Sequence, residues 1–154
     1  FDKYGVDAAR LLMCTAGPGN FKRVGPQTID GTTAPFLNTL WNTFAFSKEF
    51  FAVIKKSPTL SIEDKWILSR ANSLISEVES NLEKHEYQNC FSALNNFVVG
   101  DFSRWYIKLV RGRAEEPAVS FTIGKVFEII SKLLAPFAPY ISDYLWTEFL
   151  GNKN

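Results

Sequence analysis

Residues 94–113, LNNFVVGDFSRWYIKLVRGR, carry apolar side chains at helical spacing, and this pattern decides the fold. The apolar positions recur at steps of four, four, three and four along Leu94, Val98, Phe102, Trp105 and Leu109. That period is typical of one face of an α-helix. We therefore expect a helix from about residue 86 to residue 112 that buries this stripe against the rest of the domain.

The rest of the chain has the same helical period, and no segment alternates convincingly as a half-buried strand does. Further helices are expected over residues 7–13, from residue 25 to about residue 51, from residue 61 to about residue 82, over residues 123–134 and from residue 139 onward. Pro35 is expected to restart or kink the second of these, and Ser61 with Asp64 forms a capping box at the start of the third. These elements predict an all-α fold, an up-and-down antiparallel helical bundle of four to five helices.

Length and composition place the chain among globular domains. Its 154 residues, 46% hydrophobic and 21% charged, are enough for one domain with a core. The net charge of +1 argues against a generally basic protein, so any affinity for nucleic acid must come from a local patch. We recognise no signal peptide and no long apolar span, and we therefore expect a cytoplasmic protein with no membrane partner.

Motifs that carry catalysis or bind a metal are absent from the sequence. It contains no HExxH, GxSxG or Walker loop, so no catalytic residue is predicted. Cys14 and Cys90 lie far apart and His85 is the only histidine, so a tetrahedral zinc site cannot be assembled in the usual way. We therefore expect neither a metal nor a cofactor in this chain.

Positive charge is concentrated within residues 101–113. Four basic residues and one acid give this segment a net charge of +3, in a chain whose total is +1. Arg104, Lys108 and Arg111 line up on one side of the expected helix at about 100° per residue, and Arg113 extends the row past the helix end. The row spans about 10 Å, enough to meet two neighbouring phosphates. It is either a phosphate-binding row or an ordinary solvated helix face.

Several segments, in a fixed order, resemble the isoleucyl-tRNA synthetases of the archaeal and eukaryotic kind, which belong to class I. DFSRWYIKLVRGR at 101–113 resembles the segment Asp-Leu-Ser-Arg-Trp-Tyr-(Ile/Val)-Arg-Leu-x-Arg-x-Arg of that family. FLNTLWNTFAF at 36–46, DKWILSRANSLI at 64–75 and LLAPFAPYISDYLW at 133–146 are similar to further motifs of the family. FDKYGVDAARLLM at 1–13 is similar to the stretch that follows its KMSKS loop.

The resemblance implies that residues 25–154 form an anticodon-binding helical bundle and that residues 1–24 link it to a catalytic domain upstream in the same chain. That domain is expected to use ATP and Mg²⁺ to join isoleucine to its tRNA, so residues 1–154 are expected to be inactive alone. Valyl-tRNA synthetase is the alternative identity among related enzymes. A helical scaffold or protein-interaction bundle that binds no RNA is the alternative from another class.

The resemblance also implies contacts with tRNA at individual residues. Phosphate contacts are expected at Arg104, Lys108, Arg111 and Arg113. Contacts with the inner tRNA stem are expected at Lys22 and Arg23. Tyr106 lies off the expected core stripe and is the candidate for stacking on an unpaired base. Burial among packed helices is expected for Trp41, Trp66 and Trp105.

Overall fold

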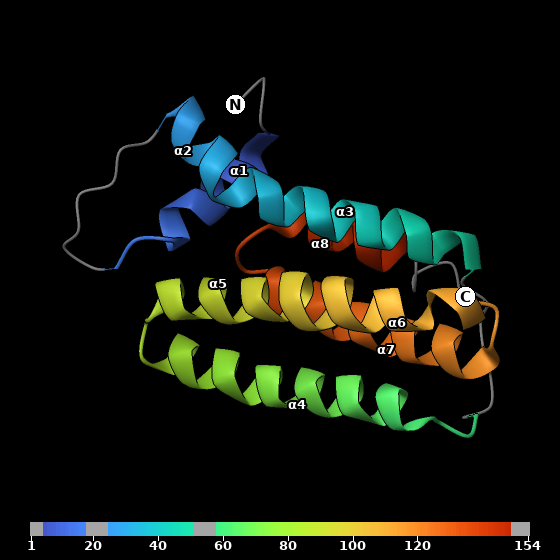
Figure 1. Ribbon diagram of the computed structural model, residues 1–154. Helices are drawn as coiled ribbons and strands as arrows, with labels where there is room; N and C mark the ends of the chain where they lie inside the picture. The colour runs from blue at the N-terminus through green and yellow to red at the C-terminus, as the bar shows by residue number, and fades with distance from the viewer. Residues whose placement is uncertain (1–4, 18–24, 51–57, 149–154) are drawn as a thin grey trace.

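The computed structural model describes residues 5–17, 25–50 and 58–148, and every regular element within these ranges is helical. In chain order the elements are α1 (Gly5–Cys14), α2 (Pro26–Gly31), α3 (Thr33–Phe50), α4 (Ile62–Glu83), α5 (Tyr87–Asn95), the π-helix η1 (Asn96–Ile107), α6 (Lys108–Val110), the 3₁₀-helix η2 (Arg111–Arg113), α7 (Pro117–Leu134) and α8 (Pro139–Trp146). The long elements are arranged as an up-and-down bundle (Figure 1). The predicted all-α bundle is therefore confirmed.

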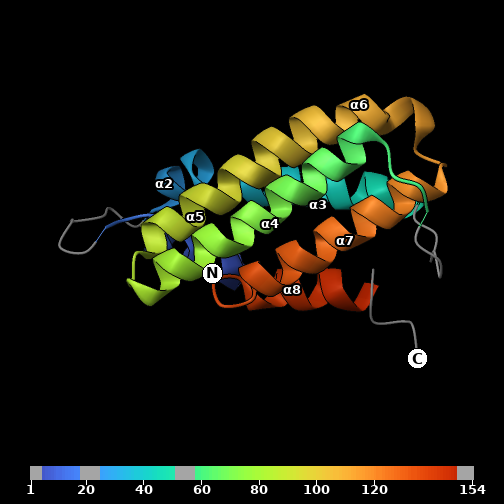
Figure 2. The same ribbon diagram turned by 90° about the horizontal axis from the view of Figure 1, so that it is seen from below.

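Elements α5, η1 and α6 follow one another without a break and form one long rod, which is the central element of the bundle (Figure 1). The rod and α7 form a middle layer, with α3 and α8 on one side of it and α4 on the other (Figures 1 and 2). Both α3 and α4 pack against η1, and Phe102 of η1 meets Phe127 of α7 edge to face, with ring centroids 5.4 Å apart. The side of the rod that none of these helices covers faces solvent.

The core face of the rod differs from the predicted stripe in its second half. A row of completely buried residues runs at steps of four along this face, at Leu94, Val98, Phe102, Tyr106 and Val110. An α-helix of 3.6 residues per turn requires a step of three to stay on one face. Because the hydrogen bonds of a π-helix run from i to i+5, its turns are wider and steps of four continue to face the core. The prediction that Trp105 and Leu109 are buried is therefore wrong.

The tryptophans expected in the core are only partly covered. Trp41, Trp66 and Trp105 are 43%, 37% and 44% exposed. Each packs on other aromatic rings: Trp41 packs on Phe44 and Tyr144, and Trp66 packs on Trp105 with ring centroids 4.2 Å apart. The fully buried aromatics are phenylalanines together with Tyr106. The expectation that the three tryptophans are core residues is wrong.

Helix α1 shares the core of the bundle, although it precedes the expected domain boundary at residue 24. Leu11 belongs to the main hydrophobic core. The carboxylate of Asp7 accepts hydrogen bonds from the backbone N–H groups of Tyr140 (3.4 Å) and Ile141 (2.7 Å). Those groups are unpaired at the start of a helix, so Asp7 caps α8 from another element. The assignment of residues 1–24 to a linker stays a prediction, while residues 5–17 pack as part of the bundle.

The starts of two helices follow the expected signals. The chain breaks at Thr32, between α2 and α3, and Pro35 lies in the first turn of α3, where its missing N–H costs no hydrogen bond. The chain therefore restarts near Pro35 and is not kinked there. Helix α4 begins with the predicted capping box, in which Ser61 accepts from the Asp64 backbone N–H and Asp64 accepts from that of Ser61.

Helix α4 ends in a Schellman motif that has a histidine where glycine is usual. The N–H of Glu86 donates to the carbonyl of Asn81 (2.8 Å), and the N–H of His85 donates to the carbonyl of Leu82 (3.0 Å). These bonds satisfy carbonyls that a helix end otherwise leaves unpaired. They require a left-handed backbone at His85, whose φ is 60°. This position therefore carries a conformational cost that a glycine avoids.

We predict that His85→Gly leaves the free energy of unfolding unchanged or raises it by up to about 1 kcal/mol, since the relief at positive φ opposes the greater entropy of an unfolded glycine. His85→Val should lower it by about 1 kcal/mol, because a β-branched residue tolerates this backbone poorly. Urea unfolding of both variants measures the difference. A valine variant as stable as the glycine variant would contradict the account of this helix end.

Candidate nucleic-acid interface

A groove of about 460 Å³ runs between α3 and the rod. We call it the basic groove. Its lining residues are Asn42, Thr43, Phe46, Ser103, Arg104, Ile107, Lys108 and Arg111. No acidic residue is among them, and three of them are cations. The groove therefore has the charge and the polar groups that a row of phosphates requires.

The three cations come together because the rod continues without a break from η1 through α6 into η2. Arg104, Lys108 and Arg111 are exposed, and none of them forms an ion pair with an acid in the described part of the chain. The guanidinium of Arg111 lies 5.1 Å from the centre of the Phe46 ring, which fixes its position by a cation–π contact. The sequence prediction that these three side chains share one side of the helix is confirmed.

The wall of the groove that α3 contributes was not identified from the sequence. Thr43 donates a hydrogen bond to Ser103 across the groove, with 2.9 Å between the two hydroxyl oxygens, and this bond ties α3 to η1. Asn42 is exposed beside it. The amide of Asn42 and the ring of Phe46 are one turn apart on the same face of α3. That spacing was visible in the sequence, but nothing in the sequence placed this face of α3 opposite the rod.

Arg113 does not belong to the basic groove. Its guanidinium contacts Glu63 at 3.3 Å and Glu116 at 3.1 Å, and it donates to the hydroxyl of Ser61 at 3.0 Å. The 3₁₀ turn η2 directs this side chain toward the start of α4. Arg113 therefore does not extend the row of cations that lines the groove. Its predicted contact with a tRNA phosphate stays a prediction.

A buried carboxylate lies at the centre of the same cluster. Asp64 is fully buried and accepts hydrogen bonds from the hydroxyls of Tyr106 and Ser61, both at 2.7 Å, and from the Ser61 backbone at 2.9 Å. Arg113 lies 4.0 Å from it. Burial works to raise the pKa of Asp64, but these hydrogen bonds and the charge of Arg113 outweigh burial and hold the pKa below its usual value. The carboxylate is therefore charged and structural.

Tyr106 is the partner of this carboxylate and has no exposed ring face. Its side chain is completely buried, and burial, followed by the hydrogen bond to Asp64 and the charge of Asp64, raises the pKa of its hydroxyl above the usual range. Stacking of a base on this ring would require the rod to separate from α4. The prediction that Tyr106 stacks on an unpaired base is therefore wrong. Lys22 and Arg23 lie outside the described residues, and their contacts with a tRNA stem stay a prediction.

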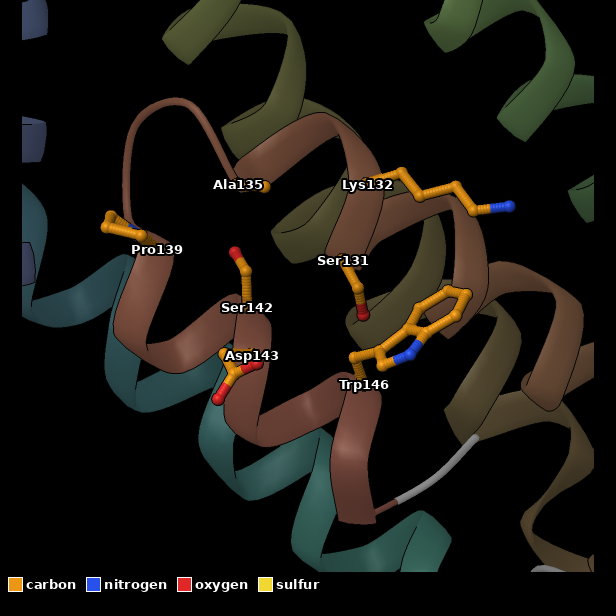
Figure 3. A pocket seen from close by; sticks show the side chains of 7 residues that line it. All are labelled: Ser131, Lys132, Ala135, Pro139, Ser142, Asp143 and Trp146. Atoms are coloured by element: carbon orange, nitrogen blue, oxygen red, sulfur yellow. The ribbon is translucent and has the colours of Figure 1, made fainter. Parts of the chain in front are cut away.

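A second hollow, of about 350 Å³, lies between α7 and α8 (Figure 3). Its charges are mixed, since Lys132 and Asp143 both line it. The hydroxyls of Ser131 and Ser142 donate to carbonyls of their own helices, at 2.7 Å each, and are not free to donate to a ligand. This hollow lacks the single sign of charge that the basic groove has, and we do not assign it as the functional site.

Neither a metal cluster nor a membrane-spanning helix occurs in the part of the chain that the structure describes. Among residues 5–17, 25–50 and 58–148, no group of three or more histidine, cysteine, aspartate or glutamate side chains is placed to hold a metal ion. No helix in these ranges combines the length and the apolarity that crossing a membrane requires.

Comparison with known protein families identifies the class of protein to which this fold and groove belong. Residues 64–154 match the family model described as the anticodon-binding domain of tRNA ligase. The match covers more than half of the chain and includes α4 from Asp64 onward, the rod, α7 and α8. The chain belongs to this family of anticodon-binding domains.

Curated relatives carry two related names. The chain is 40% identical over 129 residues to the isoleucine–tRNA ligase of Pyrococcus abyssi. This match covers 74% of the chain and 12% of the relative. It is 31% identical over 167 residues to the isoleucine–tRNA ligase of Methanopyrus kandleri, at 97% and 15% coverage. It is 30% identical over 164 residues to the valine–tRNA ligase of Streptomyces coelicolor, at 99% and 18% coverage. The chain spans less than a fifth of the length of these relatives.

A solved structure shows the same fold over almost the whole chain. It is the LeuRS of Agrobacterium radiobacter, crystallised as a ternary complex with tRNA and LeuAMS. The TM-score is 0.72 at 17% identity, and the match covers 98% of this chain and 19% of the other. At this identity the similarity establishes the fold.

The lowered pKa of Asp64 predicts a specific loss of stability in acid. Because the folded-state pKa lies below the unfolded value of about 3.9, the contribution of Asp64 is complete above that value and is lost as the pH falls through the folded-state pKa. We predict that Asp64→Asn lowers the free energy of unfolding by about 1–3 kcal/mol near neutral pH and makes its decline in acid less steep. Urea unfolding from about pH 7 to about pH 3 measures both. Parallel pH profiles for the two proteins would contradict this role.

Proposed function

We propose that this chain binds tRNA through the basic groove and positions it for aminoacylation by a catalytic domain of the same polypeptide. The observation that carries the proposal is the convergence of Arg104, Lys108 and Arg111, none paired with an acid in the described residues, on a groove without acidic lining. Cations of this kind bind phosphate oxygens and release counterions, which supplies affinity without base specificity. Membership of the anticodon-binding family identifies tRNA as the nucleic acid.

The reaction that we propose for the complete polypeptide is the attachment of isoleucine to its tRNA, with ATP and Mg²⁺ used in the catalytic domain. The identity to archaeal isoleucine–tRNA ligases, 40% with Pyrococcus abyssi, supports isoleucine. Valine is the second candidate, because a valine–tRNA ligase matches 99% of the chain at 30% identity. Because residues 64–154 match the anticodon-binding family, we assign this chain to binding and place the chemistry in a catalytic domain of the same polypeptide. We also propose a cytoplasmic location, where translation uses the product of this reaction.

The alternative of a protein-interaction scaffold fits the groove less well. Charged residues other than Arg are depleted in the cores of protein–protein interfaces, whereas this groove gathers Lys108 with two arginines around a hydrogen-bonded floor. On α7 the exposed Lys125 and Lys132 both pair with Glu128. Arg104, Lys108 and Arg111 have no such partners in the described chain.

We predict that replacing Arg104, Lys108 and Arg111 with alanine weakens tRNA binding by the complete polypeptide and flattens the slope of log affinity against log salt by about 2–3 in total, at roughly 0.7–0.9 for each lost phosphate contact. Since phosphate contacts do not specify sequence, the loss should be similar for isoleucine tRNA and for other tRNAs. Binding measured over a salt series gives both quantities.

The matched control replaces the exposed residues Lys84, Lys125 and Lys132 with alanine. This variant loses the same amount of positive charge from other faces of the bundle. The control should retain the wild-type slope, and circular dichroism checks that both triple variants are folded. Equal slopes for the wild type and the groove variant would show that the basic groove is a solvated helix face. The RNA contacts would then lie elsewhere.

A further inference from the structure

The uncovered side of the rod carries a second feature beside the basic groove, a pair of exposed tryptophans. Trp66 of α4 and Trp105 of η1 lie with ring centroids 4.2 Å apart and planes at 49°. They are 37% and 44% exposed, which is unusual for the largest apolar side chain packed in a domain of this size. We call them the tryptophan pair.

The tryptophan pair and the basic groove are on two flanks of the same rod. The groove lies toward α3, the pair lies toward α4, and the rod runs between those two helices (Figure 1). Arg104, Trp105, Lys108 and Leu109 are exposed and form a ridge that connects the two flanks. A helix with its side chains is about 10–12 Å across, so the two features are within one helix width of each other.

The order of residues on the ridge indicates the chemistry of its partner. Cations and apolar side chains alternate in adjacent pairs, Arg104 with Trp105 and Lys108 with Leu109. Proteins that bind single-stranded nucleic acid combine a basic groove that follows the backbone with aromatic rings on which bases stack. The cores of protein–protein interfaces are depleted in Lys, whereas Lys108 lies within this ridge beside Leu109.

Two acids close in sequence to the tryptophan pair are paired with cations. Asp101, four residues before Trp105, accepts from Arg70, four residues after Trp66, and both the Nε and Nη2 atoms of Arg70 are 2.9 Å from the carboxylate. Glu63, three residues before Trp66, is held by Arg113. Negative charge near the two rings is therefore compensated, and repulsion of an approaching phosphate chain is reduced.

We propose that Trp105, held in place by Trp66, stacks on an unpaired nucleobase of the tRNA whose phosphates occupy the basic groove. The proposal rests on the tRNA binding proposed above and assigns a base-contacting residue to it. The contact between the two indoles fixes the orientation of Trp105 before RNA arrives, so little conformational entropy is lost on stacking. In this arrangement the ring of Trp105 has the role that the sequence predicts for Tyr106.

The test measures binding of isoleucine tRNA to the complete polypeptide with Trp105→Ala, Trp105→Leu and Trp105→Phe. Loss of one base–aromatic stack should weaken binding by about 5- to 150-fold in the alanine and leucine variants, and phenylalanine should restore most of it. The salt slope should stay unchanged, because no phosphate contact is lost. Leucine retains apolar contact with Trp66, so it reports on stacking even where alanine lowers stability. Tyr140→Ala, which removes an exposed aromatic ring on α8, is the matched control and should bind normally.

A second arm uses the same tRNA with abasic nucleotides in its anticodon loop. Wild-type protein should bind this RNA more weakly by a similar factor, and Trp105→Leu should cause no further loss, because the base that stacks is missing. An equal loss on intact and abasic tRNA, or folded variants that bind intact tRNA normally, would overturn the inference. If alanine at Arg104, Lys108 and Arg111 still changed the salt slope in that case, the proposed binding of tRNA by the basic groove would remain supported although the stacking inference had failed. Failure of the unsubstituted polypeptide to bind tRNA at all would instead overturn the proposed function and this inference together.

Discussion

The i to i+5 hydrogen bonds of η1 determine which side of the rod meets the core, and the rest of the bundle depends on that choice. With these wider turns, Phe102 and Tyr106 point inward together, and Phe102 packs edge to face on Phe127 of α7. The same rotation turns Trp105 outward and leaves Arg104 and Lys108 beside it on the exposed ridge. A regular α-helix through the same residues would bury Trp105 and rotate Tyr106 toward solvent. The surface that we assign to RNA therefore exists because of the backbone geometry of η1.

The buried pair of Tyr106 and Asp64 fixes this orientation of the rod against α4. A hydroxyl donating to a fully buried carboxylate at 2.7 Å is a charge-assisted bond, and leaving either partner unpaired would be costly. Arg113 completes the cluster and at the same time is withdrawn from the groove. One set of interactions thus divides the basic residues of the segment into two roles. Arg113 stabilises the fold, and Arg104, Lys108 and Arg111 remain available to a ligand.

Most of the fold could be predicted from the sequence, because it follows from local rules. The capping box at Ser61, the restart of the chain near Pro35 and the period of α7 are each readable within one turn or a few. The sequence could not predict that Tyr106 points into the core and Trp105 toward solvent. The period of 3.6 residues places Trp105 in the core, and the wider turns of a π-helix were not expected. The ion pairs of Arg113 could not be predicted either, because their carboxylates, Glu63 and Glu116, lie at the N-terminal ends of two other helices. For the same reason the sequence indicated the cations of the basic groove and not its opposite wall.

The central claim, that the exposed ridge of the rod faces the RNA, is tested most directly by hydroxyl-radical footprinting of the complete polypeptide with and without tRNA. Side-chain oxidation read by mass spectrometry compares the aromatic rings of different faces in one experiment. We expect tRNA to protect Trp66 and Trp105 while Tyr140 and Trp146 on α8, which are also exposed, remain as reactive as in the free protein. Protection of the rings on α8 with no change at Trp105 would contradict the account and place the RNA on another face.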